Sequence, residues 1–284
     1  MRLQEEDDGR AAMADAAVFT PTLNPFTAAT RFASKTLVIA EMEARKLRHD
    51  FTELILRAVQ PALWLLLFGQ VLNRVREIPT GGLPYLDFIT PGILAQSGLF
   101  VAIFYGISLI WERDLGIINK LLVSPTPRAA LVLGKALSAG IRSLSQALII
   151  YALALVLGVR INWHPLALLG VLTIVVINAA LFSSFSLIVA SLVKTRERFM
   201  GIGQLLMLPL FFASNALYPV QLMPGWLRVI SRVNPLSYTV DALRALMLKD
   251  GASAFGLGMD FCVPLAVTSI LVVIGARLYP RVVV

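Results

Sequence analysis

Few side chains in this sequence are of the types that carry out covalent or metal chemistry. The two histidines, His49 and His164, lie far apart, and the single cysteine, Cys262, sits in an apolar run. One cysteine cannot form an internal disulfide, and this set of residues predicts no thiol or histidine metal site. A protease within a membrane would need a Ser/His pair, paired aspartates or a His-Glu-x-x-His motif in an apolar segment. We find none of these patterns and predict that the chain is not itself an enzyme.

Gly134 and Lys135 match only the end of a phosphate-binding loop. That loop also needs a glycine five residues before Gly134 and a Ser or Thr after the lysine, where this chain has Ala136. We therefore expect no nucleotide-binding domain and no cofactor on this chain.

Arg142 is a charged residue well inside a long apolar segment, and it shares a helical face with Ser138, Ser145 and Gln146. A charge in the hydrocarbon core of a bilayer is costly. Three roles remain open for it: the side chain extends to the inner headgroups, packs inside a helix bundle, or lines a transport path. A secondary transporter would need more ionisable residues at mid-membrane for ion coupling, so that class is a less favoured alternative.

The composition is that of a polytopic membrane protein rather than of a globular domain. Of 284 residues, 57% are hydrophobic and 15% are charged, and the mean hydropathy is +0.78. We predict an all-α fold with six membrane-spanning helices, because six apolar runs come near the roughly 20 residues that a bilayer requires. The runs are 54–73, 88–111, 136–159, 165–193, 199–218 and 258–279.

Two segments precede the spanning domain, which we place at 52–284. Residues 1–34 contain no apolar core of a signal peptide, and we expect a mobile cytosolic tail. Residues 35–51 mix apolar, basic and acidic side chains in a pattern that predicts an amphipathic helix at the inner membrane surface, where basic residues meet anionic headgroups. An ordinary solvated helix is the alternative.

Lys and Arg are unequally distributed between the two predicted sides of the membrane. With the N-terminus inside, and with Arg2 and Arg10 of the remote tail left out, the inner segments carry fifteen and the outer segments seven. Basic residues concentrate on the cytoplasmic side of membrane proteins, so both termini are predicted to be cytosolic. In a membrane protein the positions of the charges matter more than their sum. We therefore predict no nucleic-acid partner from the net charge of +8.

The segment 219–250 is predicted to re-enter the membrane from outside. Pro219 ends the preceding helix, and Asn234 followed by Pro235 is a favourable helix start. The helix that follows places Asp241 three residues before Arg244. We expect a local ion pair that holds the broken segment together and contributes little energy if it is exposed, with contact to substrate as the alternative.

An ordered set of residues carries a family signature across this part of the chain. The set comprises Ser214, Tyr218, Pro219, Leu222, Pro224, Gly225, Trp226, Asn234, Pro235, Leu236, Asp241 and Arg244. It resembles the signature of ABC-2 type exporter permeases, the membrane subunits of ATP-driven exporters of drugs, lipids and polysaccharides. The resemblance implies a multi-pass protein of the cell membrane. It would assemble as a homodimer or heterodimer with two copies of a separate ATPase subunit that binds ATP and magnesium.

The resemblance also assigns a role to the inner loop 112–135, which would present a coupling helix to the ATPase. The family pattern of this loop is matched by Glu112, Gly116, Leu121, Pro125 and Gly134-Lys135. Asn119 stands where the family often has a carboxylate, so a coupling contact that depends on an acidic residue is in doubt.

The resemblance also implies that the second and fifth spans line the substrate path. Aromatic and Met side chains form apolar, adaptable walls, although part of each stripe is expected to pack against lipid or neighbouring helices. These walls favour a hydrophobic drug or a lipid as substrate, with a lipid-linked glycan as the alternative. The candidate residues are Phe100, Phe104, Tyr105, Met207, Phe211 and Asn215. The outer gate would comprise Pro219, Trp226, Asn234, Pro235, Asp241 and Arg244.

Overall fold

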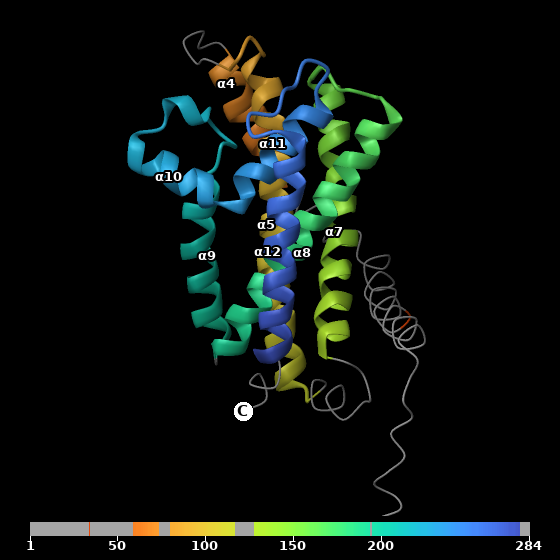
Figure 1. Cartoon of the computed structure of the whole chain (residues 1–284), viewed down its shortest axis with the longest axis vertical. Helices are drawn as coiled ribbons and strands as arrows, with labels where there is room; N and C mark the ends of the chain where they lie inside the picture. The colour runs from red at the N-terminus through yellow and green to blue at the C-terminus, as the bar shows by residue number, and fades with distance from the viewer. Residues whose placement is uncertain (1–33, 35–58, 74–79, 117–127, 194, 279–284) are drawn as a thin grey trace, which may run out of the picture.

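Figure 1 shows the computed structural model of the chain, which describes residues 34, 59–73, 80–116, 128–193 and 195–278. The described residues form helices and connecting turns, with one isolated backbone bridge between Ile161 and Leu248. This confirms the all-α prediction. Apart from Ser34, the predicted tail 1–34 and interface helix 35–51 lie outside the described residues.

Four helices in the described part of the chain are long and apolar enough to cross a membrane. They are α5 (Tyr85–Asp114), α7 (Arg128–Val156), α8 (Pro165–Leu192) and α12 (Leu257–Leu278). They correspond to the predicted second, third, fourth and sixth spans. Helix α5 begins three residues earlier than predicted, directly after Pro84, with Asp87 in its first turn. An acidic residue there interacts favourably with the helix dipole.

The predicted first and fifth spans are not confirmed as complete crossings. Of the first, residues 59–73 are described, as an apolar helix that includes the π-helical stretch η1 (Trp64–Gly69) and ends in α4 (Gln70–Asn73). The fifth was predicted over 199–218, but α9 (Arg196–Phe212) has 17 residues. At about 1.5 Å per residue it is shorter than the roughly 30 Å hydrocarbon core. Residues 213–218 leave the helix in turns and a bend.

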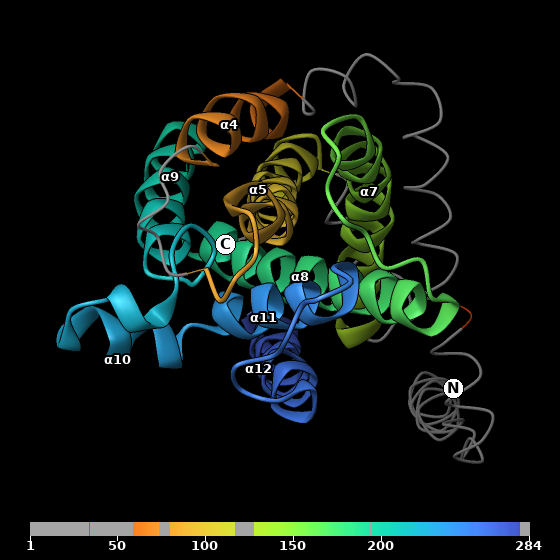
Figure 2. The ribbon, with the colours of Figure 1, turned by 90° about the horizontal axis from the view of Figure 1, so that it is seen from above.

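Helix α8 lies at the centre of the bundle. It contacts α5, α7, α11 and α12, and Figure 2 shows α5 and α7 on one of its sides and α12 on the other. Small side chains allow close approach between spanning helices. Ser186 of α8 is buried against α5, where its hydroxyl donates to Ile103 O at 2.5 Å and accepts from Gly106 N at 3.1 Å.

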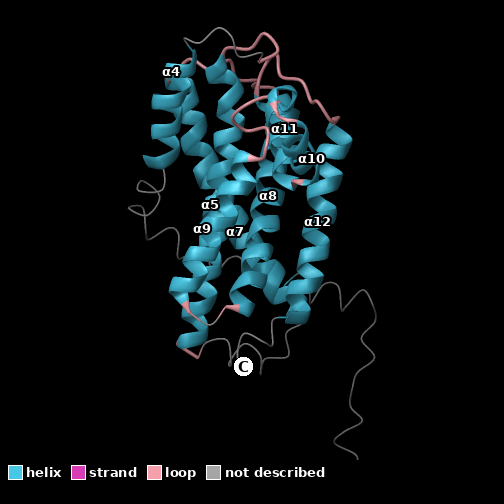
Figure 3. Cartoon of the chain, turned by 90° about the vertical axis from the view of Figure 1, so that its left-hand side faces the viewer, coloured by secondary structure: helices cyan, strands magenta, loops and turns pink. Residues whose placement is uncertain are grey.

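The segment between α9 and α12 contains three short helices near one end of the bundle. They are η2 (Val220–Leu222), α10 (Gly225–Val233) and α11 (Pro235–Met247). Figure 3 shows the longest described loops gathered at that end, and Figure 1 shows α10 lying across the bundle axis. Helix α11 packs against α5, α8 and α12, whereas α10 contacts mainly α11 and η2.

Candidate functional site

The ends of α5 and α7 that we predict to be cytosolic, and call the inner ends, are joined by an ion pair, and the opposite end of the bundle is called the outer end. Lys135 Nζ lies 2.6 Å and 2.8 Å from the two carboxylate oxygens of Glu112, and both side chains are largely buried. Glu112 therefore points into the bundle and not outward toward a partner. The predicted coupling residues Asn119, Leu121 and Pro125 lie outside the described residues.

Gly116 ends the described part of the inner loop. Its φ of +68° is a left-handed conformation that favours glycine, and its N–H donates to Arg113 O at 2.9 Å. A glycine in this conformation just after a helix is a common helix ending. Ending α5 therefore explains a glycine at position 116 without a role in binding a partner.

The inner end of α5 also contacts the start of α9. Arg196 Nη2 lies 2.8 Å from Asp114 Oδ2, and its guanidinium carbon lies 4.2 Å from the centroid of the Trp111 ring. Arg113 donates to Val193 O at 3.4 Å, just before α9. The Arg196–Asp114 pair is more than one third exposed and adds little stability. It nevertheless links the predicted second and fifth spans beside the inner loop.

Tyr105 faces α7 and lies away from α9. Lys135 Nζ lies 5.7 Å and the guanidinium carbon of Arg142 lies 5.3 Å from the centroid of its ring. Both distances are within the range of cation–π attraction. Of the three roles left open for Arg142, packing inside the bundle fits this arrangement. Tyr105 does not join the other predicted path residues.

A cavity of about 280 Å³ lies between α5, α9 and the first apolar segment. Two of the predicted path residues, Phe100 and Met207, line it together. The full lining comprises Gln60, Phe100, Ile103, Phe199, Met200, Gly203, Gln204, Met207 and Leu208. The lining is mostly apolar, with Gln60 and Gln204 as its polar side chains.

The other predicted path residues are placed elsewhere. Phe211 is buried in ring contacts with Trp64 and Phe212, with centroids 5.8 Å and 5.4 Å away. Asn215 lies beyond the end of α9, at a separate outer pocket that also includes Asp241 and Arg244. The backbone of Phe104 belongs to α5, but its side chain is not among those described.

Asn234 begins α11, as predicted, and also joins it to α9. Its side-chain oxygen accepts from Leu236 N at 3.0 Å, which is the expected capping contact. Its side-chain nitrogen donates to Leu210 O at 2.6 Å. Pro235 follows in the first turn of α11. One residue thus fixes the start of α11 and holds it against the end of α9.

The predicted Asp241–Arg244 ion pair is present, but it is buried and long. Both residues are buried, and the closest distance between their charged atoms is 3.9 Å. Arg244 Nη2 donates to Asn215 O at 2.8 Å, and its guanidinium carbon lies 3.9 Å from the centroid of the Phe88 ring. Burial lowers the pKa of Arg244 to about 10, against the opposing effect of Asp241, so the guanidinium remains charged at neutral pH.

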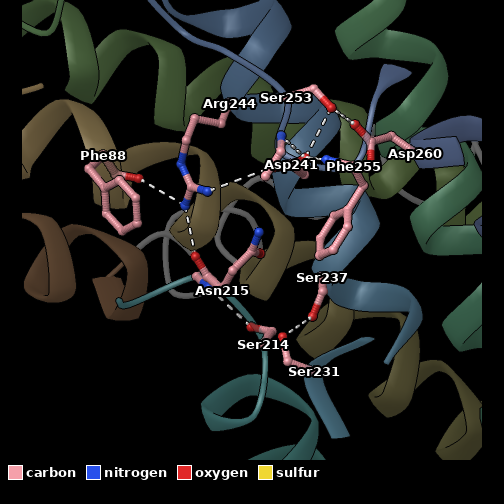
Figure 4. A network of polar contacts seen from close by, with 12 residues as sticks. Phe88, Ser214, Asn215, Ser231, Ser237, Asp241, Arg244, Ser253, Phe255 and Asp260 are labelled. Carbon is pink, nitrogen blue, oxygen red and sulfur yellow. Dashed lines mark hydrogen bonds and ion pairs between the residues drawn. The ribbon is translucent and has the colours of Figure 1, made fainter. Parts of the chain in front are cut away.

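Asp241 makes its closest contacts with the chain after α11. Its Oδ2 accepts from Ala254 N at 2.6 Å, from Phe255 N at 3.0 Å and from the Ser253 hydroxyl at 3.0 Å. Figure 4 shows Arg244 directed toward Phe88 and Asn215, while Asp241 is directed toward 253–255. Helix α11 is therefore anchored to two different parts of the bundle.

The remaining predicted gate residues behave differently from one another. Pro219 precedes η2 in an extended conformation. Trp226 of α10 is 67% exposed and lies beside the exposed apolar residues Val229, Ile230 and Val233. In contrast, Leu236 and Val240 of α11 are completely buried in the protein.

Two junction residues were missed by the sequence analysis. Arg160 Nε lies 3.1 Å from Asp87 Oδ2, and its Nη1 lies 3.0 Å from Asp250 Oδ2, so it joins α5 to both outer loops. Asp260 of α12 is fully buried and lies 2.7 Å from the Ser253 hydroxyl, opposite Asp241. The available signal for Asp260 was a charged residue at the start of an apolar run. Asp241, on the other side of Ser253, is 19 positions away in sequence, so the sequence did not indicate that the two residues lie close together.

Comparison with known proteins agrees with this arrangement. The family described as "ABC-2 type transporter" matches residues 34–248. The chain is 30% identical over 220 residues to a putative transport permease ycf38 of Cyanophora paradoxa, covering 76% of this chain and 74% of that protein. It is 25% identical over 233 residues to the daunorubicin resistance ABC transporter permease protein DrrB1 of Streptomyces coeruleorubidus, covering 82% and 81%.

A third relative is similar over a smaller part of its length. The probable multidrug ABC transporter permease YbhR of Escherichia coli K12 is 30% identical over 180 residues, which cover 63% of this chain and 48% of that protein. The family match covers most of the present chain, and the described structure contains several apolar helices long enough to cross a membrane. This protein therefore belongs to the ABC-2 type transporter family of membrane permeases.

Proposed function

We propose that the chain is the permease subunit of an ATP-driven exporter of hydrophobic drug-like or lipid molecules. The observation that carries this proposal is the mostly apolar cavity between α5 and α9, which Phe100 and Met207 line together. Aromatic and Met side chains adapt to varied apolar ligands. The names of two relatives, which refer to daunorubicin resistance and multidrug transport, support the same substrate class.

The contacts at the inner end suggest how ATP would drive transport. A separate ATPase subunit, in two copies, would bind ATP and magnesium and push on the inner loop 112–135. The Glu112–Lys135 pair fixes the base of that loop, and the Asp114–Arg196 pair links it to α9. Movement of the loop would therefore displace α5 and α9, the two main walls of the cavity. Two permease subunits, identical or paralogous, would move against each other in the cell membrane, with both termini in the cytosol.

The outer segment would close the path until substrate leaves. Asn234 holds α11 to α9, and Arg244 holds it to α5 and to the chain after α9. Because α11 contacts both walls of the proposed path, an outward opening must change these contacts. Pro219, Trp226 and Pro235 would shape the same gate without forming its polar contacts.

The test is transport by the permease reconstituted in vesicles with its partner ATPase, with daunorubicin as the probe. Replacement Gly203→Leu extends a side chain from α9 toward Ile103 and fills the cavity. We expect insertion and ATPase docking to be normal, with daunorubicin transport and its stimulation of ATP hydrolysis reduced at least tenfold. Ile270→Trp, at an exposed position on α12 away from the cavity, is the control and should transport normally.

The same assay separates the alternative substrate class. A complex stimulated by a lipid-linked glycan and indifferent to daunorubicin and to phospholipid would favour a glycan exporter. Normal daunorubicin transport by the Gly203→Leu variant would exclude this cavity from the path. ATP turnover by the purified permease alone would contradict its assignment as a subunit without ATPase activity.

A further inference from the structure

A single hydroxyl group lies between two buried carboxyl groups at the outer end of the bundle. Ser253 Oγ is 3.0 Å from Asp241 Oδ2 and 2.7 Å from Asp260 Oδ2. Gly256 N also donates to Ser253 Oγ, at 2.6 Å. Figure 4 shows Ser253 between the carboxyl group of α11 and that of α12. All three distances are those of hydrogen bonds.

The number of protons available limits how these contacts form. A serine hydroxyl donates one hydrogen and accepts two, whereas an ionised carboxylate only accepts. Ser253 cannot donate to both Asp241 and Asp260 at once. If one carboxyl group carries a proton and donates it to Ser253, every contact becomes a hydrogen bond. The hydroxyl then donates once and accepts twice, from that carboxyl group and from Gly256 N.

The surroundings indicate which carboxyl group carries the proton. Asp241 accepts from Ala254 N and Phe255 N as well as from Ser253, and Arg244 lies nearby. Donors to a carboxylate stabilise its charged form. Asp260 is 0% exposed, and its Oδ1 has no hydrogen-bond partner among the residues that the structure describes. A buried charge without a partner is costly, so the neutral acid fits Asp260.

The helices packed on α12 supply no counter-charge at this position. Helix α8 has no ionisable side chain along its length. The cations of α7 with described side chains, Lys135 and Arg142, contact Tyr105 on α5. From α11, Arg244 is engaged by Asn215 and Phe88.

The loop between α11 and α12 carries its charges at the surface. Asp250 of that loop is exposed and pairs with Arg160, and Lys249 is exposed as well.

We propose that Asp241, Ser253 and Asp260 form a proton-binding site in which Asp260 carries the proton and fastens the re-entrant helix α11 to the outer end of α12. Loss of the proton would remove one donor and place a second negative charge near Asp241. The contact between α11 and α12 would then weaken. Because α11 also holds α9 through Asn234 and α5 through Arg244, the proton would stabilise the closed arrangement of the outer segment. This inference does not depend on the identity of the transported substrate.

The direct test is infrared spectroscopy of the purified full-length protein in lipid at neutral pH, in H₂O and D₂O. A protonated carboxyl group has a carbonyl stretch that is separate from that of a carboxylate. Asp260→Asn should remove that signal, while its amide N–H still donates to Ser253. The matched control Asp87→Asn changes a buried carboxylate paired with Arg160 and should leave the signal in place. An unchanged signal in Asp260→Asn would overturn the proposal.

A second variant and a second measurement cover the case in which Asp260→Asn fails to fold. Ser253→Ala removes the hydrogen-bond partner of the acid, so its carbonyl stretch should move to higher frequency without disappearing. In thermal unfolding, the wild-type protein should lose stability as the pH rises, because its folded state holds a proton that the unfolded carboxyl group releases. Stability that depends on Na⁺ or K⁺ concentration instead of pH would assign the site to a metal cation and contradict the proposal.

Discussion

Glu112, in the last turn of α5, and Lys135, in the first part of α7, form an ion pair with 2.6 Å between Lys135 Nζ and Glu112 Oε2. The pair therefore holds together the ends of the two helices that flank the predicted coupling loop. If a partner ATPase pushes on the loop, as we propose, both helices would move together while the pair is intact. The two residues appear in the family pattern as separate positions, and the structure gives them one shared role.

Breaking this pair from one side should be more harmful than replacing both partners. Glu112→Gln leaves the buried ammonium group of Lys135 without its carboxylate, and removal of one member of a buried pair costs about 3–5 kcal/mol. The double variant Glu112→Gln/Lys135→Met removes both charges and should recover much of that loss. Thermal unfolding of the detergent-solubilised protein measures the difference. Equal losses in the single and double variants would contradict an energetic role for the pair.

Asn234 should have two separable roles. Asn234→Ala removes the cap of α11 and should cost about 0.5–2 kcal/mol locally, with normal insertion and ATPase docking but reduced transport. Asn234→Asp keeps an oxygen for Leu236 N and removes the donor to Leu210 O. Its helix should remain capped while α11 separates from α9. Hydrogen exchange at the start of α11, compared between the two variants, distinguishes cap loss from loss of the α9 contact.

Asp241 and Arg244 should behave as largely separate anchors of α11. Arg244→Ala removes contacts with Asn215 and Phe88, whereas Asp241→Ala leaves the N–H groups of Ala254 and Phe255 without their acceptor. The double variant should therefore be less stable than either single variant. A double-mutant cycle measured by thermal unfolding provides the check. A double variant no worse than Arg244→Ala alone would restore the local ion pair as the main interaction.

The orientation in the membrane can be tested by cysteine labelling in a Cys262→Ala background. Leu115, at the inner end of α5, is 69% exposed, and Trp226 of α10 is 67% exposed. The excess of Lys and Arg on the segments assigned to the inside predicts that Leu115 lies in the cytosol and Trp226 outside. An impermeant thiol reagent applied to intact cells should label Trp226→Cys and not Leu115→Cys. The opposite result would invert the topology. Asp241 is unsuitable for this test because it is buried.

Local sequence was enough to predict several elements of the structure. The apolar runs that form α5, α7, α8 and α12 are long and continuous. Most of their observed boundaries lie within a few residues of the predicted ones. The start of α11 at Asn234-Pro235 was also predictable. Helix capping depends on hydrogen bonds between residues two or three positions apart. The residues next to Asn234 are therefore enough to predict where the helix begins.

The early end of α9 required the tertiary structure. The apolar run continues to Tyr218, which led to the prediction of a complete span. In the structure, residues after Phe212 leave the helix and pack beside α5, where a Cβ at Gly92 would lie 2.5 Å from Ala216 O. Hydrophobicity alone cannot separate a chain that crosses a bilayer from one that is covered by other helices, because both environments favour apolar residues.

The positions of the polar side chains depended most on tertiary structure. The spacing of residues on one helix indicates which of them share a face. The rotation of that helix about its own axis decides what this face contacts. Tyr105 and Phe100 belong to the same helix, yet Tyr105 faces the cations of α7 and Phe100 lines the α9 cavity. Likewise, the spacing of Asp241 and Arg244 predicted a pair without indicating its burial. The sequence determined the family, the main helices and the break at Asn234. The pairing of Glu112 with Lys135 and the approach of Asp241 and Asp260 to Ser253 were decided by tertiary packing, because the energy of a charge depends on neighbours that lie far away along the chain.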